Sequence, residues 1–410
     1  MKVLSLFSGC GGMDIGFEGN FVCLKRSINI DMHYDWIAEE RGEWVKLAPT
    51  KFKTVFANDI RPDAKAAWVS YFGKEDIYHL DSIVNLVKRA RNGEKIFPEG
   101  VDIVTGGFPC QDFSIAGKRM GFNSEKSHNG RKIIANMPSI ENRGRLYMWM
   151  RDVITIAKPS LFIAENVKGL TNLNDVKEII EQDFAKSADG GYIVVPARVL
   201  QAADYGVPQS RERVIFYGFK KSALTANAMK ALTSKDIPQE FDPYPIPTHA
   251  YTFTDISKSK PVTCQEAFIG LDEPDFSSDL SQKKYSKAKF MGKHCQGQTE
   301  VKLDSISPTI RSEHHGNIEY RRLSKENGGI HTKELEEGLK ERRLTVRECA
   351  RIQTFPDNYQ FVKQGIISAS DAYKIIGNAV PCVLAYNIAK RIEENWKKYF
   401  KGDNYDCCRK

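Results

Sequence analysis

The 410-residue sequence lacks any apolar stretch long enough to cross a bilayer. Its first residues, MKVLSLFSGCGG, hold one lysine and a short apolar run interrupted by glycine, so they predict no secretory signal. The nine cysteines include no Cys-x-x-Cys pair and no evenly spaced framework, and the adjacent pairs at 294–295 and 314–315 cannot easily point at one metal. We therefore expect a cytoplasmic chain with neither disulfides nor a metal centre.

Internal repeats and low-complexity tracts are also absent, and the composition, with 41% hydrophobic and 27% charged residues, is that of a folded globular protein. The formal net charge of +8 permits a polyanionic partner such as a nucleic acid. Spread over so many residues, it does not require one. The length is sufficient for one large domain and a smaller one.

Short apolar runs alternate with polar, helix-favouring stretches in the first half of the chain. This alternation predicts a doubly wound α/β fold, in which helices cover both faces of a mostly parallel sheet. The expected strands are 3–7, 54–58, 101–106, 161–165, 192–200 and 214–219. After residue 219 the sequence becomes proline-rich and irregular, and a last helix with an apolar stripe is expected at 382–399. We predict one domain over 1–219 plus 371–410, and a second, smaller irregular domain with a hinge over 220–370.

A glycine-rich turn follows the first expected strand and contains Phe7, Gly9, Gly11 and Gly12. Glycines at the carboxyl end of a parallel strand let the backbone approach a nucleotide-type ligand closely. A tight turn that holds no ligand would have the same pattern. The spacing matches neither the dinucleotide fingerprint nor a phosphate loop, so a phosphate cradle is the poorer interpretation.

Two acidic residues follow later expected strands. Asp59 ends the second strand, where a carboxylate can accept hydrogen bonds from ribose hydroxyls. Asp81 follows a third possible strand and could bond an adenine amino group. Either residue could instead cap a helix, which is the commoner role of a lone aspartate.

The sharpest feature is the sequence GGFPCQDFS at 106–114, which follows an apolar strand. A cysteine after proline on such a turn lies at the carboxyl edge of the sheet, where reactive thiols work. Taken alone, a cysteine such as Cys110 is more often buried and inert.

Charged residues occur at the ends of two further strands. Glu165 follows four apolar residues, and a carboxylate there is costly unless it has a partner or a task. Gln209, Arg211 and Arg213 alternate before the strand at 214–219, so their side chains are expected on one face. An edge strand with solvated arginines is the alternative interpretation.

Six ordered motifs together resemble the DNA cytosine-5 methyltransferase family. They are FSGCGG at 7–12, GFPCQ at 107–111, ENV at 165–167, QSRER at 209–213, RRLTVRECARIQTFPD at 342–357 and IGNAVP at 376–381. They cover most of the chain outside 220–335. The resemblance implies the fold of S-adenosylmethionine-dependent methyltransferases and methyl transfer to carbon 5 of cytosine in double-stranded DNA.

The resemblance also assigns the catalytic residues. Cys110 matches the nucleophile that adds to carbon 6, which makes carbon 5 reactive toward the methyl group. Glu165 matches the acid that engages the ring nitrogen and the exocyclic amino group. Arg211 matches a residue that holds the base near the thiol, and Arg213 of the same motif is grouped with it. The target cytosine must be flipped out of the duplex, and water is a candidate for removing the carbon 5 proton.

For the cofactor, S-adenosyl-L-methionine, the family pattern maps onto a set of residues from several motifs. These are Phe7, Gly9, Gly11, Gly12, Asp59, Asp81, Pro109, Leu146 and Asn378. Asp59 stands where the family often has glutamate, and either acid can bind a ribose. The segment 114–145 is similar to the mobile loop that closes over the flipped base. Two stretches, 19–54 and 123–142, are longer than the family pattern requires.

In the family, the region that corresponds to 220–335 holds the target recognition domain. Here it contains five lysines, at 283, 284, 287, 289 and 293, near Tyr285 and Phe290, which could follow DNA phosphates. A solvated lysine-rich helix is the alternative. The segments 307–311 and 314–317 carry polar groups that could read base edges.

Other functions are less compatible with the motifs. The related tRNA methyltransferases carry a Cys-Phe-Thr signature, which this sequence lacks, and an amino-methylating enzyme would need an Asp/Asn-Pro-Pro-aromatic motif where Gly-Phe-Pro-Cys stands. A non-catalytic DNA-binding relative should have lost a catalytic residue, and none is lost. The family further implies a monomeric bacterial or phage modification enzyme, whose restriction endonuclease would be a separate protein.

Overall fold

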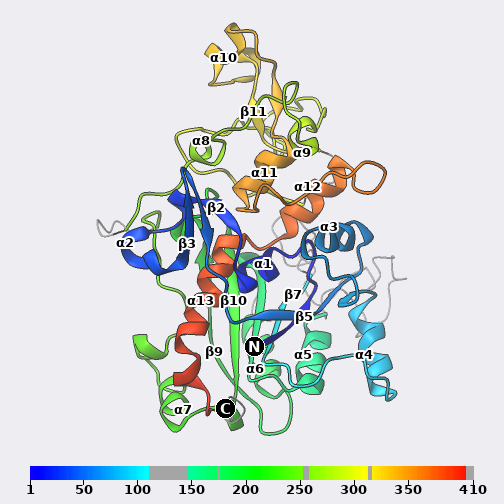
Figure 1. Ribbon diagram of the computed structural model, residues 1–410, viewed down its shortest axis with the longest axis vertical. Coiled ribbons are helices and arrows are strands. Elements are labelled where there is room, and N and C mark those ends of the chain that lie inside the picture. Colours follow the sequence, from blue (N-terminus) through cyan, green and yellow to red (C-terminus); the bar gives the residue numbers. More distant parts are fainter. Residues whose placement is uncertain (110–145, 173–175, 253–257, 313–315, 403–410) are drawn as a thin grey trace.

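The computed structural model describes residues 1–109, 146–172, 176–252, 258–312 and 316–402. Its centre is a seven-stranded sheet in the order β6-β5-β1-β7-β8-β10-β9 (Figure 1). The strands are β1 (Lys2–Leu6), β5 (Lys53–Asp59), β6 (Tyr78–Leu80), β7 (Ile103–Gly107), β8 (Leu161–Val167), β9 (Tyr192–Gln201) and β10 (Glu212–Lys220). Neighbouring strands are parallel from β6 to β8, whereas β10 is antiparallel to both β8 and β9. The predicted mostly parallel sheet is confirmed.

Alternate residues of each central strand pack on opposite faces of the sheet, as its pleat requires. Val3, Ile103 and Ile163 belong to one buried apolar cluster, and Leu4 and Val104 belong to another. The helices on the two faces are α1 (Gly12–Glu18), α3 (Pro62–Phe72) and α13 (Cys382–Tyr399) for the first cluster, and α4 (Ile83–Arg91), α5 (Leu146–Ala157) and α6 (Val176–Ala185) for the second. Both faces are therefore covered, which is the doubly wound arrangement.

The last helix, α13, brings the end of the chain back to its beginning. A Cβ atom on Gly12 would lie 2.2 Å from the carbonyl oxygen of Val380, and one on Gly16 would lie 2.4 Å from the Cβ of Ala385. Only glycine permits such a close approach of α1 to the start of α13. The sequence motifs at 7–12 and 376–381 are thereby placed in direct contact.

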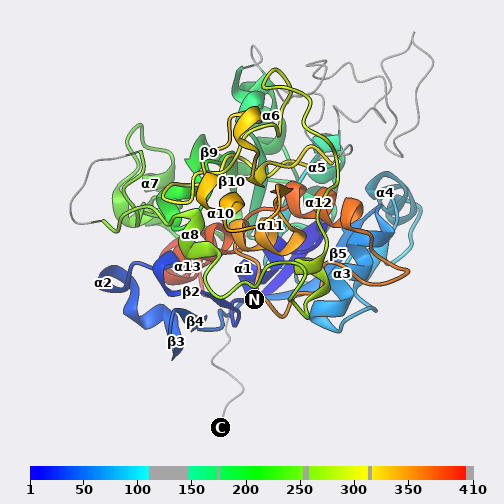
Figure 2. The same cartoon turned by 90° about the horizontal axis from the view of Figure 1, so that it is seen from above.

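The long stretch after α1 forms a small antiparallel sheet beside the large one (Figures 1 and 2). It contains β2 (Val22–Leu24), α2 (Ile30–His33), β3 (Ile37–Arg41) and β4 (Trp44–Leu47), with β4 in the middle of the three strands. Trp36 anchors this unit, because its ring packs edge-on against Tyr386 of α13 at a centroid distance of 5.4 Å. The other long stretch, 123–142, lies outside the described residues.

The chain does not leave the large sheet at residue 220, where the sequence predicts a domain boundary. The next segment, with α7 (Ala226–Leu232), stays beside α13, and the backbone N–H of Thr225 donates to the carbonyl of Tyr399 at 2.9 Å. The Tyr244 hydroxyl donates to the carbonyl of Ile215 in β10 at 2.8 Å. Apolar residues of this segment, such as Leu224 and Leu232, complete the core of the sheet. The proline-rich composition of the segment did not indicate in the sequence that these residues are buried.

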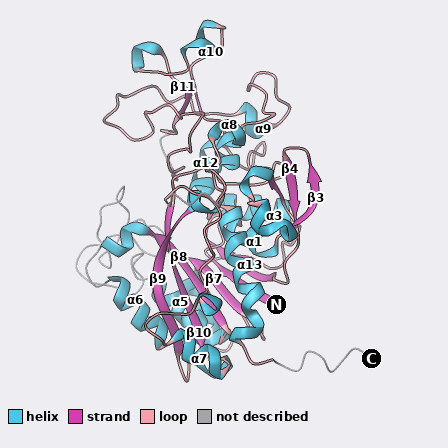
Figure 3. Ribbon diagram, turned by 90° about the vertical axis from the view of Figure 1, so that its left-hand side faces the viewer, coloured by secondary structure: helices cyan, strands magenta, loops and turns pink. Residues whose placement is uncertain are grey.

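The remaining elements form an upper region that consists mostly of loops (Figure 3). They are α8 (Cys264–Ala267), α9 (Leu280–Lys283), β11 (Tyr320–Arg322), α10 (Thr332–Glu336), β12 (Arg342–Arg343), α11 (Val346–Ile352) and α12 (Ala369–Asn378). Buried arginines hold it together: Arg342 forms ion pairs with Glu273 at 3.0 Å and Glu348 at 2.8 Å. Ile310 and Leu344 of this region belong to the same apolar cluster as the large sheet, so the two parts share one core. No helix in the described part of the chain is long and apolar enough to cross a membrane.

Candidate functional site

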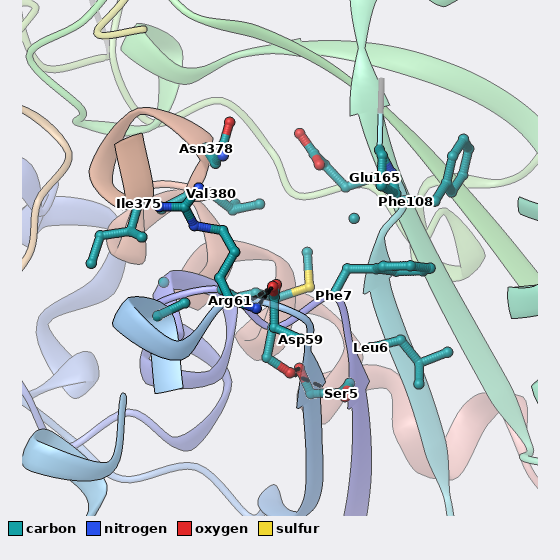
Figure 4. Close-up of a pocket in the computed structure, with 18 of the residues that line it drawn as sticks. Ser5, Leu6, Phe7, Asp59, Arg61, Phe108, Glu165, Ile375, Asn378 and Val380 are labelled. Carbon is teal, nitrogen blue, oxygen red and sulfur yellow. Dashed lines mark hydrogen bonds between the residues drawn. The ribbon is translucent and has the colours of Figure 1, made fainter. Parts of the chain in front are cut away.

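A cavity of about 320 Å³ opens at the carboxyl ends of β1, β5, β7 and β8 (Figure 4). This is the edge at which parallel α/β sheets bind ligands. Its lining contains 5–9, 12–13, 58–61, 64, 82–83, 107–109, 146, 165–167, 213, 312, 375 and 377–380. Of the predicted site residues, the lining includes Phe7, Gly9, Gly12, Asp59, Pro109, Leu146, Glu165, Arg213 and Asn378. Residues from both ends of the chain therefore face one cavity.

The glycine-rich turn takes backbone conformations that few residues tolerate. Gly9 has φ +53° and Gly11 has φ +79°, both in the left-handed region that favours glycine. Phe7 has φ +52°, which is costly for a residue with a side chain and is typical of functional sites. A Cβ on Gly9 would meet no atom within 4 Å, so the turn leaves open space at the cavity wall.

Asp59 fastens this turn to the end of β5. One carboxylate oxygen accepts a hydrogen bond from the backbone N–H of Gly9 at 3.0 Å, and the other accepts one from the backbone N–H of Arg61 at 3.0 Å. Burial raises the pKa of Asp59, and these backbone donors act against that rise. Figure 4 shows the Asp59 side chain beside the cavity, where a carboxylate can accept hydrogen bonds from ligand hydroxyls.

Two predicted cofactor residues do not line the cavity. Gly11 begins α1, and a Cβ there would lie 2.6 Å from the ring of Trp68, so this glycine serves close packing. The Asp81 carboxylate accepts hydrogen bonds from the Ser82 N–H at 2.7 Å and from Asn85 at 2.9 Å. It is thus engaged beside the start of α4, although the residue that caps this helix is Ser82 and not Asp81.

The turn that carries the predicted nucleophile is described up to Pro109. Cys110 and the predicted closing loop, 114–145, lie outside the described residues. The buried side chain of Asn166 donates a hydrogen bond to the Phe108 carbonyl at 3.1 Å, which holds the start of this turn. Phe108 and Pro109, the last residues described before position 110, line the cavity.

Glu165 and Arg213 form an ion pair beside this wall. The Nε of Arg213 lies 2.7 Å from Oε1 of Glu165, and both side chains are about nine-tenths buried. Burial raises the pKa of Glu165, while the charges of Arg213 and Arg211 oppose the rise. A Cβ on Gly107 would lie 2.9 Å from Oε2 of Glu165, so the glycine makes room for the carboxylate. The arrangement can present an oriented acid to a ligand.

Arg211 takes a different place from Arg213, although the sequence predicts one shared face. Its guanidinium, which is fully buried, donates to the carbonyls of Ile310 at 3.0 Å, Gly377 at 2.9 Å and Ala379 at 2.8 Å. It does not line the cavity; it holds the turn that carries Asn378. The difference arises because β10 begins only at Glu212, so the residues before it do not alternate as in a strand.

Several residues of the site escaped the sequence reasoning. Gln353, which is fully buried, donates to the carbonyl of Ile376 at 2.8 Å and accepts from Gln209 at 3.1 Å, which further fixes the turn at 376–379. Arg61 lines the cavity and extends from beside Asp59 toward α12 (Figure 4). A signal existed for Gln353, because it lies inside the motif at 342–357. None existed for Ser312, which reaches the cavity through packing alone.

The described residues contain no cluster of three or more histidines, cysteines or acids that could hold a metal ion. A family model described as C-5 cytosine-specific DNA methylase matches residues 1–394. The chain is 30% identical over 411 residues to the Type II methyltransferase M.NgoPII of Neisseria gonorrhoeae, with 97% of each chain covered. It is 30% identical over 413 residues to the Type II methyltransferase M.BsuRI of Bacillus subtilis, covering 97% of this chain and 80% of that one.

Solved structures give the same picture of the fold. The Dnmt2 methyltransferase of S. pombe aligns with a TM-score of 0.56 at 17% identity, covering 96% of this chain and 99% of that chain. The methyltransferase EhMeth of Entamoeba histolytica aligns with a TM-score of 0.56 at 14% identity, covering 97% and 98%. At such low identity these likenesses concern the architecture alone.

Proposed function

Because the chain belongs to the C-5 cytosine-specific DNA methylase family, we propose that it methylates a flipped cytosine in duplex DNA through covalent attack by Cys110. The chain is a DNA cytosine-5 methyltransferase that uses S-adenosyl-L-methionine. The observation that carries the finer mechanism is the shared cavity, which joins the glycine turn, Asp59, Pro109 and the Glu165–Arg213 pair.

The residues of the cavity fit S-adenosyl-L-methionine. Asp59 offers a half-buried carboxylate for ribose hydroxyls, the open space at Gly9 admits close contact with the backbone, and Phe7 and Leu146 offer apolar surface to an adenine ring. Asn378 offers a polar side chain at the opposite wall. When bound, the cofactor supplies an electrophilic methyl group on a sulfonium sulfur.

Carbon 5 of cytosine is a poor nucleophile, so covalent addition by the protein is required first. In the proposed step, the Cys110 thiolate forms a bond to carbon 6, and the electron pair of the 5,6 double bond becomes available at carbon 5. Glu165 donates its proton to the ring nitrogen N3, which neutralises the charge that the addition places on the ring. Its raised pKa favours the protonated form that this step needs, and Arg213 fixes its orientation.

Completion of the reaction requires the carbon 5 proton to leave. As the proton departs, its electron pair reforms the 5,6 double bond and the carbon–sulfur bond breaks, returning the Cys110 thiolate. The N3 proton returns to the Glu165 carboxylate, which restores both the neutral base and the acid. Water is the proposed acceptor of that proton. Since the target carbon is hidden in stacked DNA, the base must rotate out of the duplex to reach the cavity.

We further propose that DNA recognition belongs to the part of 220–370 beyond the segment that packs on the large sheet, and that 1–219 with 371–410 holds cofactor and catalytic residues. The relatives named Type II methyltransferases support a role in restriction-modification. A separate endonuclease would then cut unmethylated DNA, and the modification enzyme would act as a monomer in the bacterial cytoplasm.

The test is transfer of labelled methyl from S-adenosyl-L-methionine to unmethylated genomic DNA and, in parallel, to tRNA. Bisulfite sequencing of the DNA locates the modified cytosines. We expect label on DNA cytosine with the wild type and none with Cys110→Ser, because a serine hydroxyl is not ionised at neutral pH. Undiminished transfer by Cys110→Ser would refute the covalent mechanism. Label on tRNA alone would refute the DNA substrate.

A further inference from the structure

A lysine-rich segment, residues 283–298, runs across the upper region of the molecule outside regular secondary structure after α9 ends at Lys283. Its five lysines, at 283, 284, 287, 289 and 293, are all exposed, and none forms an ion pair with any residue that the structure describes. Lys287 lies over the ring of Tyr285, with its Nζ 3.4 Å from the ring centroid. The interpretation of these lysines as a solvated helix therefore fails for the four that follow Lys283, since an irregular backbone displays them.

A single buried arginine holds this irregular backbone. The Arg343 guanidinium donates to the carbonyls of Ala288 at 2.8 Å, Lys289 at 3.2 Å and Gly297 at 2.6 Å, and also to that of Ile318. It is 1% exposed. Among the described acids none is its ion-pair partner, so the backbone carbonyls, together with Oε1 of Gln298 at 3.3 Å, compensate its buried charge. The interior of the segment, at 288–289, and its end, at Gly297, are thereby tied to one side chain.

Arg343 is also supported from its other side, where the ring of Tyr320 lies 4.1 Å from the guanidinium carbon. A lysine at this position has one ammonium group with three donors and lacks the planar fork that reaches four carbonyls. The position thus demands arginine for geometry and not only for charge.

A short series of close contacts connects the segment 283–298 to the cavity. A Cβ on Gly297 would lie 1.6 Å from the Asn317 carbonyl oxygen, and Arg311 donates to that same oxygen at 3.3 Å. A Cβ on Gly377 would lie 2.2 Å from the backbone of Arg311. Ser312 and Gly377 both line the cavity. A duplex that delivers a base to the cavity would accordingly pass close to the lysine segment.

We propose that Arg343 is a positioning residue that shapes the segment 283–298 so that Lys287, Lys289 and Lys293 bind the phosphates of duplex DNA beside the target cytosine. This proposal rests on the proposed function and adds the surface by which the substrate is held. Exposed cations that form no ion pair with a described residue, on a fixed backbone, suit a regular row of phosphates. Arg343 acts through the segment and has no contact with DNA.

The first experiment tests the lysines with a triple variant, Lys287→Ala, Lys289→Ala and Lys293→Ala. A matched control replaces Lys221, Lys230 and Lys235, which are exposed around α7 at the opposite end of the molecule (Figure 1). The KM for DNA is measured against salt concentration. Each lost phosphate contact lowers the slope of log KM against log salt by about 0.9, which is about eightfold in affinity at 0.1 M salt. The control removes the same charge and should leave the slope unchanged.

The second experiment compares Arg343→Lys and Arg343→Ala with the wild type. We expect a rise of roughly tenfold or more in the KM for DNA and methylation at near-cognate sites by bisulfite sequencing, with kcat and the Kd of the cofactor within about twofold. If Arg343 only stabilised the fold, its replacement would instead reduce the fraction of protein that is active, which lowers the apparent kcat at an unchanged KM. If Arg343→Ala does not fold, Arg343→Lys keeps the charge and carries the test.

The outcomes separate this proposal from the proposed function. A wild type that leaves DNA cytosine unmethylated refutes the function itself. A wild type that methylates DNA, with a triple lysine variant whose salt slope matches the control, refutes the phosphate contact. An unchanged KM in both Arg343 variants refutes the positioning role.

Discussion

Replacing Asp14 by asparagine should make the protein more stable at neutral pH, although it removes a carboxylate two residues after the glycine-rich motif. Asp14 lies in the first turn of α1, is 1% exposed, and accepts a hydrogen bond from Trp68 Nε1 at 2.7 Å. Burial raises its pKa from 3.8 to about 6, and the hydrogen bonds from Ser5 and Trp68 only partly oppose that rise.

The sign of the effect follows from linkage between protonation and folding. A carboxyl group whose pKa is higher in the folded state binds its proton more tightly there, so its favourable contribution is complete below pH 3.8 and is lost as the pH rises through about 6. The difference between the two pKa values corresponds to about 3 kcal/mol of unfolding free energy above about pH 7. The asparagine side chain of the Asp14→Asn variant carries no charge at any pH, and its carbonyl oxygen can still accept the hydrogen bond from Trp68.

The assay is urea unfolding of wild type and Asp14→Asn at several pH values from about 4 to about 8. We expect similar unfolding free energies near pH 4 and an advantage for the variant that grows to about 3 kcal/mol at about pH 7. Trp68→Phe serves as a control, because it keeps a ring beneath Gly11 and removes the N–H donor, which should steepen the loss of stability with rising pH. A difference between Asp14→Asn and wild type that is independent of pH would refute the reasoning.

Three further predictions concern the cavity and the turn beside it. Glu165→Gln should lower kcat by about 10²- to 10⁴-fold at unchanged KM for DNA, as measured by labelled methyl transfer. In the same assay, the kcat of the wild type should fall as rising pH deprotonates Glu165. An unchanged kcat in the variant would exclude the role of Glu165 as an acid. Gly12→Ala should lower the free energy of unfolding by about 1–3 kcal/mol in denaturant and weaken cofactor binding in calorimetry, because the new methyl group would overlap the Val380 carbonyl. An affinity for the cofactor equal to that of the wild type would show that the turn can shift. Arg211→Lys should lower the free energy of unfolding by about 2 kcal/mol and weaken cofactor binding, because one ammonium group cannot reach the three carbonyls that Arg211 contacts. A loss of kcat at an unchanged Kd for the cofactor would instead indicate that Arg211 contacts the base.

The strand pattern of the large sheet could be predicted because it depends on local chemistry. The run at 161–164 is apolar at every position, as strands covered on both faces must be, and the structure places β8 there. The apolar stripe at 382–399 corresponds to α13 with the same bounds. Residues at strand ends, including Asp59 and Glu165, were found because the carboxyl edge of a parallel sheet collects functional groups.

Other features depended on partners distant in the sequence. Nothing local distinguishes Arg211 from Arg213, yet one holds the turn at 376–379 and the other pairs with Glu165. Asp81 has the spacing of a cofactor ligand, but its carboxylate is engaged by Ser82 and Asn85. The proline-rich stretch after residue 219 carried no sign that it would return to the sheet.

The sequence alone thus determined the fold class and the family, because periodicity and short motifs express which segments are buried and which residue types stand at the strand ends. The tertiary structure alone decided which charged side chain faces the cavity and which serves as a support. That division follows from the cost of burying charge: each buried arginine or carboxylate must find a partner, and the partners of Arg211 and Arg343 come from segments far away in the chain. The pattern of the sequence cannot specify these contacts, because they form only after the elements have packed.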